Sequence, residues 1–217
     1  MLSKAEAAVP GKPVRIRRVR VAGEERRRQI IEAATTLFSR KGFRGTTTRE
    51  IARAVGVSEA MLFKHFATKE ELYAAIIEVK SHVVQLMDTV LGAAERGDDA
   101  EVLRTLAREM IARTRADPTL MRLTFFSALE GHALSDMMFR SRVQQLDDFL
   151  SRYIARRIAA GVFRAVDPLQ AAWNFSGMVA YHVQRQELFG QKPPRHLTSD
   201  RAVEEIVQLF LNGVRRS

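Results

Sequence analysis

The sequence predicts an all-α fold in which a small N-terminal domain of three helices precedes a larger helical domain, with about nine helices in all. Three observations support this. Apolar residues recur at helical spacing almost everywhere after residue 22, and strand-like alternation never persists. Residues that start and stop helices punctuate the chain at matching intervals. Hydrophobic residues make up 46% of the 217 residues, enough to bury a sizeable core.

The N-terminal elements follow in order. Residues 1–22 contain Pro10, Gly11 and Pro13 among arginines and lack an apolar period, which predicts a disordered basic arm. This arm is either a solvated tail or a segment that lies along DNA. Ser58 is a good N-cap for a third helix. We expect the first four helices over 24–40, between the threonines at 46–48 and Gly56, over 59–66 and over 68–91.

The rest of the chain predicts five longer helices. Asp117-Pro118 and Asp167-Pro168 are favourable helix starts, since proline fits the first turn and aspartate suits the positive end of the helix. Gly161 is a favourable helix stop. The expected ranges are 100–114, 118–130, 135–160, 168–188 and 199–214.

The net charge of +10 is concentrated at one end. Residues 1–80 hold 17 Lys and Arg against 9 Asp and Glu, whereas the rest holds 18 against 16. Such polarity favours a polyanionic partner at the N-terminus, although a basic tail on an ordinary surface explains it equally well. The lack of cysteine excludes disulfides and fits a reducing compartment. With neither an apolar signal stretch nor a membrane-length apolar run, we expect a cytoplasmic protein without a membrane partner.

The stretch from Thr46 to Phe66 has the pattern of a helix-turn-helix. Its two short helices would pack through apolar residues, and Gly56 would allow the tight turn between them. The second helix would then present its outer face to a major groove of DNA. The residues expected to pack are Ile51, Ala52, Val55, Val57 and Leu62.

At these positions the sequence resembles the TetR/AcrR family of bacterial transcriptional regulators. The resemblance covers about residues 26–75. It is carried by Thr47-Thr48, Ile51-Ala52, Val55-Gly56-Val57-Ser58, Leu62-Phe63, His65-Phe66, Lys69 and Leu72, and upstream by Ile30–Ala34, Leu37-Phe38 and Lys41–Phe43. It implies a DNA-binding domain over 23–70 and a ligand-binding and dimerisation domain over 71–217.

The resemblance also implies which residues meet double-stranded operator DNA. They are Thr47, Thr48, Arg49, Ser58, Glu59, Ala60, Met61, Phe63, Lys64, His65 and Lys69. His65 and Lys69 should hold phosphates, whereas Arg49, Met61 and Lys64 should sense bases.

Several of these positions have a second interpretation. Thr47 could be only a helix cap, and His65 could serve only local structure. Met61 either touches a thymine methyl or folds back onto the core, and Glu59 either accepts from a cytosine amine or points away. Phe63 stands where the family usually has tyrosine, so a phenolic hydroxyl is absent.

The larger domain is rich in methionine and aromatic residues, which suit an adaptable apolar cavity for a small-molecule effector. Ordinary core packing is the alternative for each of them. The residues expected to bind the effector are Met121, Phe125, Phe126, Met137, Trp173, Asn174 and Tyr181.

The last two helices carry apolar faces that predict a homodimer interface. An intramolecular core is the alternative. The interface residues expected from the pattern are Trp173, Gly177, Ala180, Val203, Ile206, Val207, Phe210 and Leu211.

These features together predict a ligand-responsive DNA-binding transcriptional regulator, with repression expected from the family resemblance. Two other functions compete with it: a ligand-independent structural DNA-binding protein and a small helical enzyme. The sequence has no phosphate-binding glycine loop, no nucleophile elbow and no His-Glu-x-x-His motif. We therefore expect no catalytic residues, no cofactor and no metal site.

Overall fold

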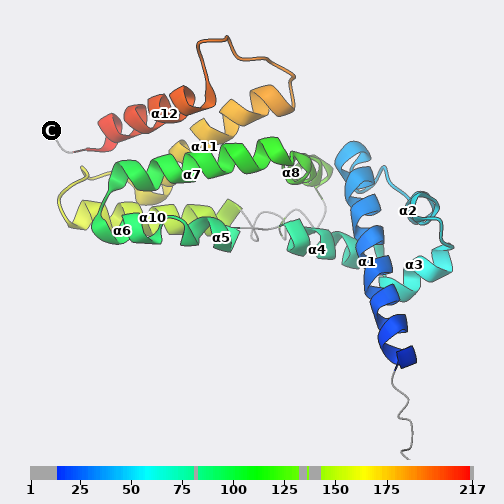
Figure 1. The fold of residues 1–217 in the computed structure, drawn as a ribbon. Coiled ribbons are helices and arrows are strands. Elements are labelled where there is room, and N and C mark those ends of the chain that lie inside the picture. The colour runs from blue at the N-terminus through cyan, green and yellow to red at the C-terminus, as the bar shows by residue number, and fades with distance from the viewer. Residues whose placement is uncertain (1–13, 81–82, 132–135, 137–142, 216–217) are drawn as a thin grey trace, which may run out of the picture.

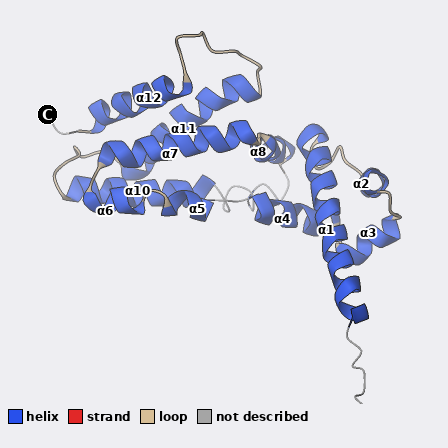
Figure 2. Ribbon diagram, in the orientation of Figure 1, coloured by secondary structure: helices blue, strands red, loops and turns tan. Residues whose placement is uncertain are grey.

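The computed structural model describes residues 14–80, 83–131, 136 and 143–215. Within these residues the chain forms helices and loops, with one isolated bridge between Phe163 and Arg215 (Figure 2). Figure 1 shows a head, formed by α1 to α3, at one end of an elongated molecule. A body of longer helices forms the other end, and α4 leads from the head toward it. The all-helical, two-part fold predicted from the sequence is confirmed.

The first helix is longer than predicted. α1 spans Val14–Lys41, so it begins ten residues before the expected start at 24. Residues 14–22 of the expected disordered arm therefore continue the helix, and residues 1–13 lie outside the described part. Residues 14–22 contain no proline or glycine. They extend the helix because adding residues to an existing helix costs less free energy than nucleating a new one.

Local polar contacts begin and end the two short helices of the head. α2 (Thr48–Val55) is preceded by a capping box, in which the Thr47 hydroxyl accepts from the Glu50 amide at 3.2 Å and the Glu50 carboxylate accepts from the Thr47 amide at 2.9 Å. Gly56 ends α2 with a φ of 71°, and the Ser58 hydroxyl caps α3 (Glu59–His65). The turn and both cap positions predicted from the sequence are confirmed.

The helix expected over 68–91 is described as α4 (Lys69–Lys80) and α5 (Val83–Asp88), and residues 81–82 lie outside the described chain. A turn at 89–90 follows α5, and α6 spans Leu91–Arg96. The Thr68 hydroxyl accepts from the Glu71 amide at 3.0 Å, which begins α4 at the predicted position.

The body is built around α7 (Asp99–Ala116), which packs against the last two helices, α11 (Pro168–Glu187) and α12 (Ser199–Val214). α8 (Thr119–Glu130) packs on α1, and α10 (Gln145–Ala159) packs on α11. The helix expected from 135 is described only from its later part, since residues 132–135 and 137–142 lie outside the described chain.

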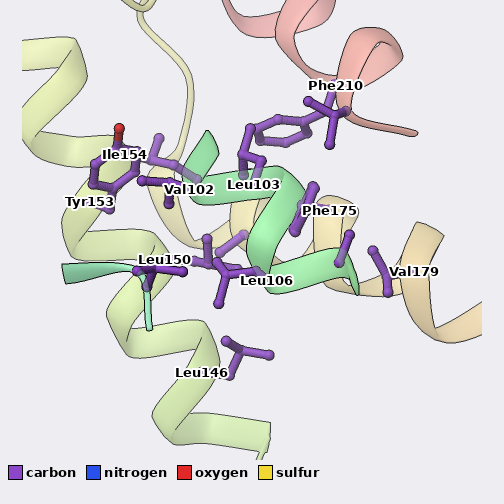
Figure 3. Packing of buried hydrophobic residues seen from close by; sticks show 14 of the residues in the cluster. Val102, Leu103, Leu106, Leu146, Leu150, Tyr153, Ile154, Phe175, Val179 and Phe210 are labelled. Carbon is purple, nitrogen blue, oxygen red and sulfur yellow. The ribbon is translucent and has the colours of Figure 1, made fainter. Parts of the chain in front are cut away.

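The buried residues form two separate clusters. The body cluster joins α7, α10, α11 and α12 around Leu103 and Leu106 (Figure 3). The head cluster contains Phe38 and Leu62, and it also takes Tyr73 from α4 and Leu123 from α8. The core of the head therefore extends past residue 70, where the sequence placed the domain boundary.

Among the helices of the described chain, none combines the length and the apolar character needed to cross a lipid bilayer.

Candidate functional site

The outer face of α3, which the sequence predicts to meet DNA, is exposed. Leu62 is fully buried and holds α3 on the head, whereas Met61 is 39% and Phe63 45% exposed. Lys64 and Ala60 are also exposed, and His65 is half-buried at the end of the helix. Since Met61 is exposed, it does not fold back into the core, and its contact with a base stays a prediction.

Four polar residues of this face are occupied by contacts within the head. The Thr47 hydroxyl accepts from and donates to Glu50, and the Ser58 hydroxyl accepts from the Met61 amide. The Thr48 hydroxyl donates to Glu59 Oε1 at 2.7 Å, which ties the start of α2 to the start of α3. These contacts fix the relative placement of the two short helices, while Arg49 stays exposed.

Glu50 also forms an ion pair at the start of α2. Lys41 Nζ lies 2.7 Å from Glu50 Oε1, and this contact, together with the hydrogen bonds from Thr47, lowers the pKa of Glu50 to about 2. The pair joins the end of α1 to the first turn of α2.

Lys69 holds the loop that precedes α2. Its ammonium donates to the carbonyl of Phe43 and lies 4.2 Å from the centre of the Phe43 ring, and partial burial lowers its pKa. Lys69 also stands at the positive end of α4, where an anion would be stabilised. Its expected phosphate contact is neither supported nor opposed by this arrangement and stays a prediction.

A residue of α8 also binds the loop that precedes α2. Glu130, at the end of α8, accepts from the amides of Phe43 at 3.1 Å and Arg44 at 3.2 Å. Gly42 lies against this contact, and a Cβ added there would come within 2.1 Å of Glu130 Oε1 and 3.0 Å of the Phe126 ring. Phe126, which the sequence assigned to the effector site, therefore lies at the junction of head and body.

A cavity of about 640 Å³ opens between α7, α8, α10 and α11. Its size falls within the ~300–1,000 Å³ typical of small-molecule sites. The residues that line it are Met110, Thr114, Met121, Thr124, Phe125, Val143, Asp147, Trp173, Ser176, Gly177, Val179, Ala180, Val183 and Gln184.

The structure brings together three of the seven residues predicted to bind the effector: Met121, Phe125 and Trp173. Asn174 and Tyr181 are exposed and do not line the cavity, because they lie on the outward face of α11. Met137 lies outside the described residues.

The cavity also contains a carboxylate, that of Asp147, which is not among the residues predicted from the sequence. Asp147 is 4% exposed, accepts from the Ser176 hydroxyl at 3.2 Å and is also hydrogen-bonded by Trp173. Burial raises its pKa, and the neighbouring Asp148 adds to the effect. The signal was present in the pattern, since Asp147 shares the apolar face of α10 with Leu150 and Ile154 at helical spacing.

The stripe of α12 that was predicted to form the dimer interface is part of the core of the protomer. Val203, Val207, Phe210 and Leu211 are all less than 9% exposed, and the Phe210 ring lies 5.3 Å from that of Phe175. Figure 3 shows Phe210 reaching from α12 toward α7. The partly buried Ile206 packs against the same cluster. Helical spacing shows that a face is buried without showing what covers it, and here the core of the protomer covers the four buried residues. A dimer contact through the α12 stripe, including the partly buried Ile206, stays a prediction.

The remaining interface residues lie on α11. Trp173 is 48% exposed and Gly177 is exposed, whereas Ala180 is half-buried beside the cavity. On α12 the exposed apolar residue is Leu209, at 68%. A role for Trp173 and Gly177 in dimerisation stays a prediction.

Comparison with known proteins identifies both halves of the chain. Residues 30–76 match the model described as bacterial regulatory proteins of the tetR family, and residues 99–213 match the model of the AefR-like transcriptional repressor C-terminal domain. The structure of AibR in complex with isovaleryl coenzyme A and operator DNA is 25% identical, with a TM-score of 0.64 over 85% of this chain and 97% of that one. PfmR from Thermus thermophilus shares the fold, with 23% identity and a TM-score of 0.63 over 86% of this chain and 99% of that one.

Curated relatives include the nucleoid occlusion factor SlmA. The protein from Actinobacillus pleuropneumoniae serotype 5b (strain L20) is 30% identical over 132 residues, which are 58% of this chain and 61% of the relative. That from Vibrio vulnificus (strain YJ016) is 32% identical over 56% of this chain and 60% of the relative. The chain thus spans about three fifths of the length of these relatives. The two family models together show that the chain belongs to the tetR family of bacterial regulatory proteins, with a C-terminal domain of the AefR-like transcriptional repressor type.

Proposed function

We propose that this protein is a ligand-responsive transcriptional repressor that binds a palindromic operator as a homodimer in the cytoplasm. A small apolar or amphipathic molecule in the cavity would release it from DNA. The observation that carries the proposal is the double role of α8, which lines the cavity with one face and enters the core of the head with the other. Because regulators of this family are generally not enzymes, we propose no catalytic activity.

The head supplies the DNA-binding part of this function. The exposed face of α3 would enter a major groove, and the caps of α2 and α3 hold that face in place. Arg49, which is exposed in the first turn of α2, would contribute to the contact with DNA. Two heads related by two-fold symmetry would read half-sites about 34–36 Å apart.

The coupling between cavity and DNA runs through α8. Met121, Thr124 and Phe125 line the cavity, Leu123 enters the core of the head, and Glu130 holds the loop before α2. A ligand that displaces α8 would therefore move that loop.

A second connection joins α4 to the turn before α8. Lys80 Nζ lies 2.6 Å from Asp117 Oδ2, and this ion pair joins the end of α4 to the turn between α7 and α8. Both connections would change the separation of the two heads when the body changes conformation, and the operator would then be released.

Binding-site selection with the full chain tests the DNA-binding part. The expected product is a site with two inverted half-sites about one helical turn apart. Operator affinity is then measured by fluorescence anisotropy with and without a ligand found by thermal shift. A ligand that binds should weaken operator binding, and the operator should weaken ligand binding by the same factor, with a coupling of roughly 1–3 kcal/mol.

Two variants of α8 sharpen this test. Phe125→Ala removes a side chain from the cavity wall and should weaken ligand binding, whereas Leu129→Ala changes a residue that is 83% exposed and absent from the wall. The proposal fails if no sequence is enriched, or if saturating ligand leaves operator affinity unchanged.

A second candidate function is a ligand-independent role in chromosome organisation. It is favoured by the 30% identity to nucleoid occlusion factors over more than half of the chain. The two functions differ in what the cavity does. If the selected site occurs at many dispersed chromosomal positions and no ligand changes its occupancy, the second function is the better description.

A further inference from the structure

The cavity contains one feature that selects among chemical classes of ligand, the buried carboxylate of Asp147. Among the described residues that line the cavity, Asp147 is the only one with a formal charge. We propose that the effector is an apolar molecule carrying a protonated amine, and that Asp147 is the residue that recognises the amine. This inference rests on the proposed role of the cavity as the effector site.

In the free protein the Asp147 carboxylate is buried and has neutral hydrogen-bond partners. Its side chain is 4% exposed, and within the described chain no lysine, arginine or histidine pairs with it. Its partners are neutral donors, the Ser176 hydroxyl and the Trp173 indole. A buried carboxylate without a counter-charge is costly, and two neutral hydrogen bonds offset only part of that cost. A ligand cation would supply the missing charge and use lone pairs that the two donors leave open.

The cavity wall around Asp147 contains aromatic and flexible apolar side chains. Trp173 and Phe125 present aromatic rings to the cavity, and rings of this kind attract cations through their negative faces. Met110 and Met121 add flexible apolar surface that fits an irregular hydrocarbon part. The wall therefore complements both halves of an apolar amine.

The same features disfavour an anionic ligand. A carboxylate or phosphate placed in the cavity would lie near Asp147 without a basic residue among the described lining residues to balance it. A neutral ligand would leave the carboxylate as it is in the free protein.

The experiment compares three probes with one hydrocarbon skeleton and different head groups: 8-phenyloctylamine, 8-phenyloctanol and 8-phenyloctanoate. Binding to the full chain is measured without DNA, by isothermal titration calorimetry and by the emission of Trp173, the single tryptophan. The amine should bind at least about tenfold more tightly than the alcohol, as expected for one hydrogen bond to a charged group, and the carboxylate should bind most weakly.

Two variants locate the effect. Asp147→Asn keeps the shape of the side chain and should reduce amine affinity by about tenfold or more while leaving alcohol affinity within about twofold. Asp148→Asn makes the same change of charge at the next residue, which is exposed and does not line the cavity, and should leave the preference intact.

The inference is overturned if the alcohol or the carboxylate binds as tightly as the amine, if none of the three probes binds, or if Asp147→Asn retains the amine preference. None of these outcomes bears on operator binding by the free protein, which the site-selection experiment measures separately. The charge preference and the proposed repressor function can thus fail independently.

Discussion

The head and the body are held together by different means, and the difference matches what each has to do. In the head, side-chain hydrogen bonds cap both short helices. The loop before α2 is held by Lys69, which donates to the Phe43 carbonyl, and by Glu130, which accepts from the Phe43 amide. In the body, an apolar cluster surrounds α7, and a cavity of about 640 Å³ remains beside α8 and α11. The head thus has many fixed points where a rigid face is needed, and the body keeps open space where a ligand can act.

Helix α8 belongs to both regions, because it lines the cavity of the body and contributes to the core of the head. Its consecutive residues Phe125 and Phe126 face different regions, the first toward the cavity and the second toward Gly42 of the head. A small movement of α8 would therefore change both the cavity and the packing against Gly42, as coupling between the two regions requires.

The largest expected effect is in the core of the body. Phe210→Asp places an unpaired charge where Phe175 and the α7 side chains now pack, and we expect a loss of about 4 kcal/mol or more in the free energy of unfolding. Leu209→Asp, at the adjacent position that is 68% exposed, is the matched control and should change it by less than about 0.5 kcal/mol. Urea unfolding followed by circular dichroism measures both. A stable, folded Phe210→Asp monomer would instead support the interface assignment for this residue.

The junction of the two regions is the next most sensitive place. Gly42→Ala introduces a Cβ at a φ of 75° and into contact with Glu130 and Phe126, which should cost roughly 1–3 kcal/mol of stability. It should also weaken operator binding, because the loop before α2 loses its fixed position. Gly131→Ala, at a φ of 61° with nothing within 4 Å of the added Cβ, tests backbone strain alone. Equal effects of the two changes on operator affinity would remove Gly42 from the coupling.

On the DNA-binding face, Lys64 and Lys69 should behave differently. Lys64→Ala should relax base preference by about 1–3 kcal/mol at the position that it reads. Lys69→Ala should weaken all sites alike and lower the salt slope by about 1, with an added loss of stability because the Phe43 carbonyl loses the Lys69 ammonium as a donor. Site selection over a salt series measures both quantities. A changed operator preference in Lys69→Ala, with none in Lys64→Ala, would reverse the two roles.

The smallest expected effect concerns pH and the start of α2. The pKa of Glu50 is lowered to about 2 in the folded chain, from an ordinary value of 4.5, chiefly by Lys41. The stabilisation is therefore fully present above pH 4.5 and is lost as the pH falls from 4.5 toward 2. Unfolding measured over this range should show a steeper loss for the wild type than for Glu50→Gln. Parallel profiles would show that the pair contributes nothing to stability.

The outlines of the head were predictable because they depend on neighbours in sequence. Thr47, Gly56 and Ser58 act on amides no more than a few residues away, so the sequence alone placed α2, α3 and the turn between them. The first helix was misjudged at its start, since its extension to Val14 depends on an adjoining helix rather than on apolar spacing.

By itself the sequence determined the helical character of the chain, the helix-turn-helix and the family resemblance, because caps, turns and helical spacing are local properties. Only the tertiary structure decided what covers each buried face. In that structure the apolar stripe of α12 packs on α7, and Asp147 lies in the wall of a cavity. Phe125 faces the cavity, whereas the next residue, Phe126, lies against Gly42 of the head. Helical spacing specifies the direction in which a side chain projects from the axis of its helix. The contact that the side chain makes depends on how helices that are distant in sequence pack together.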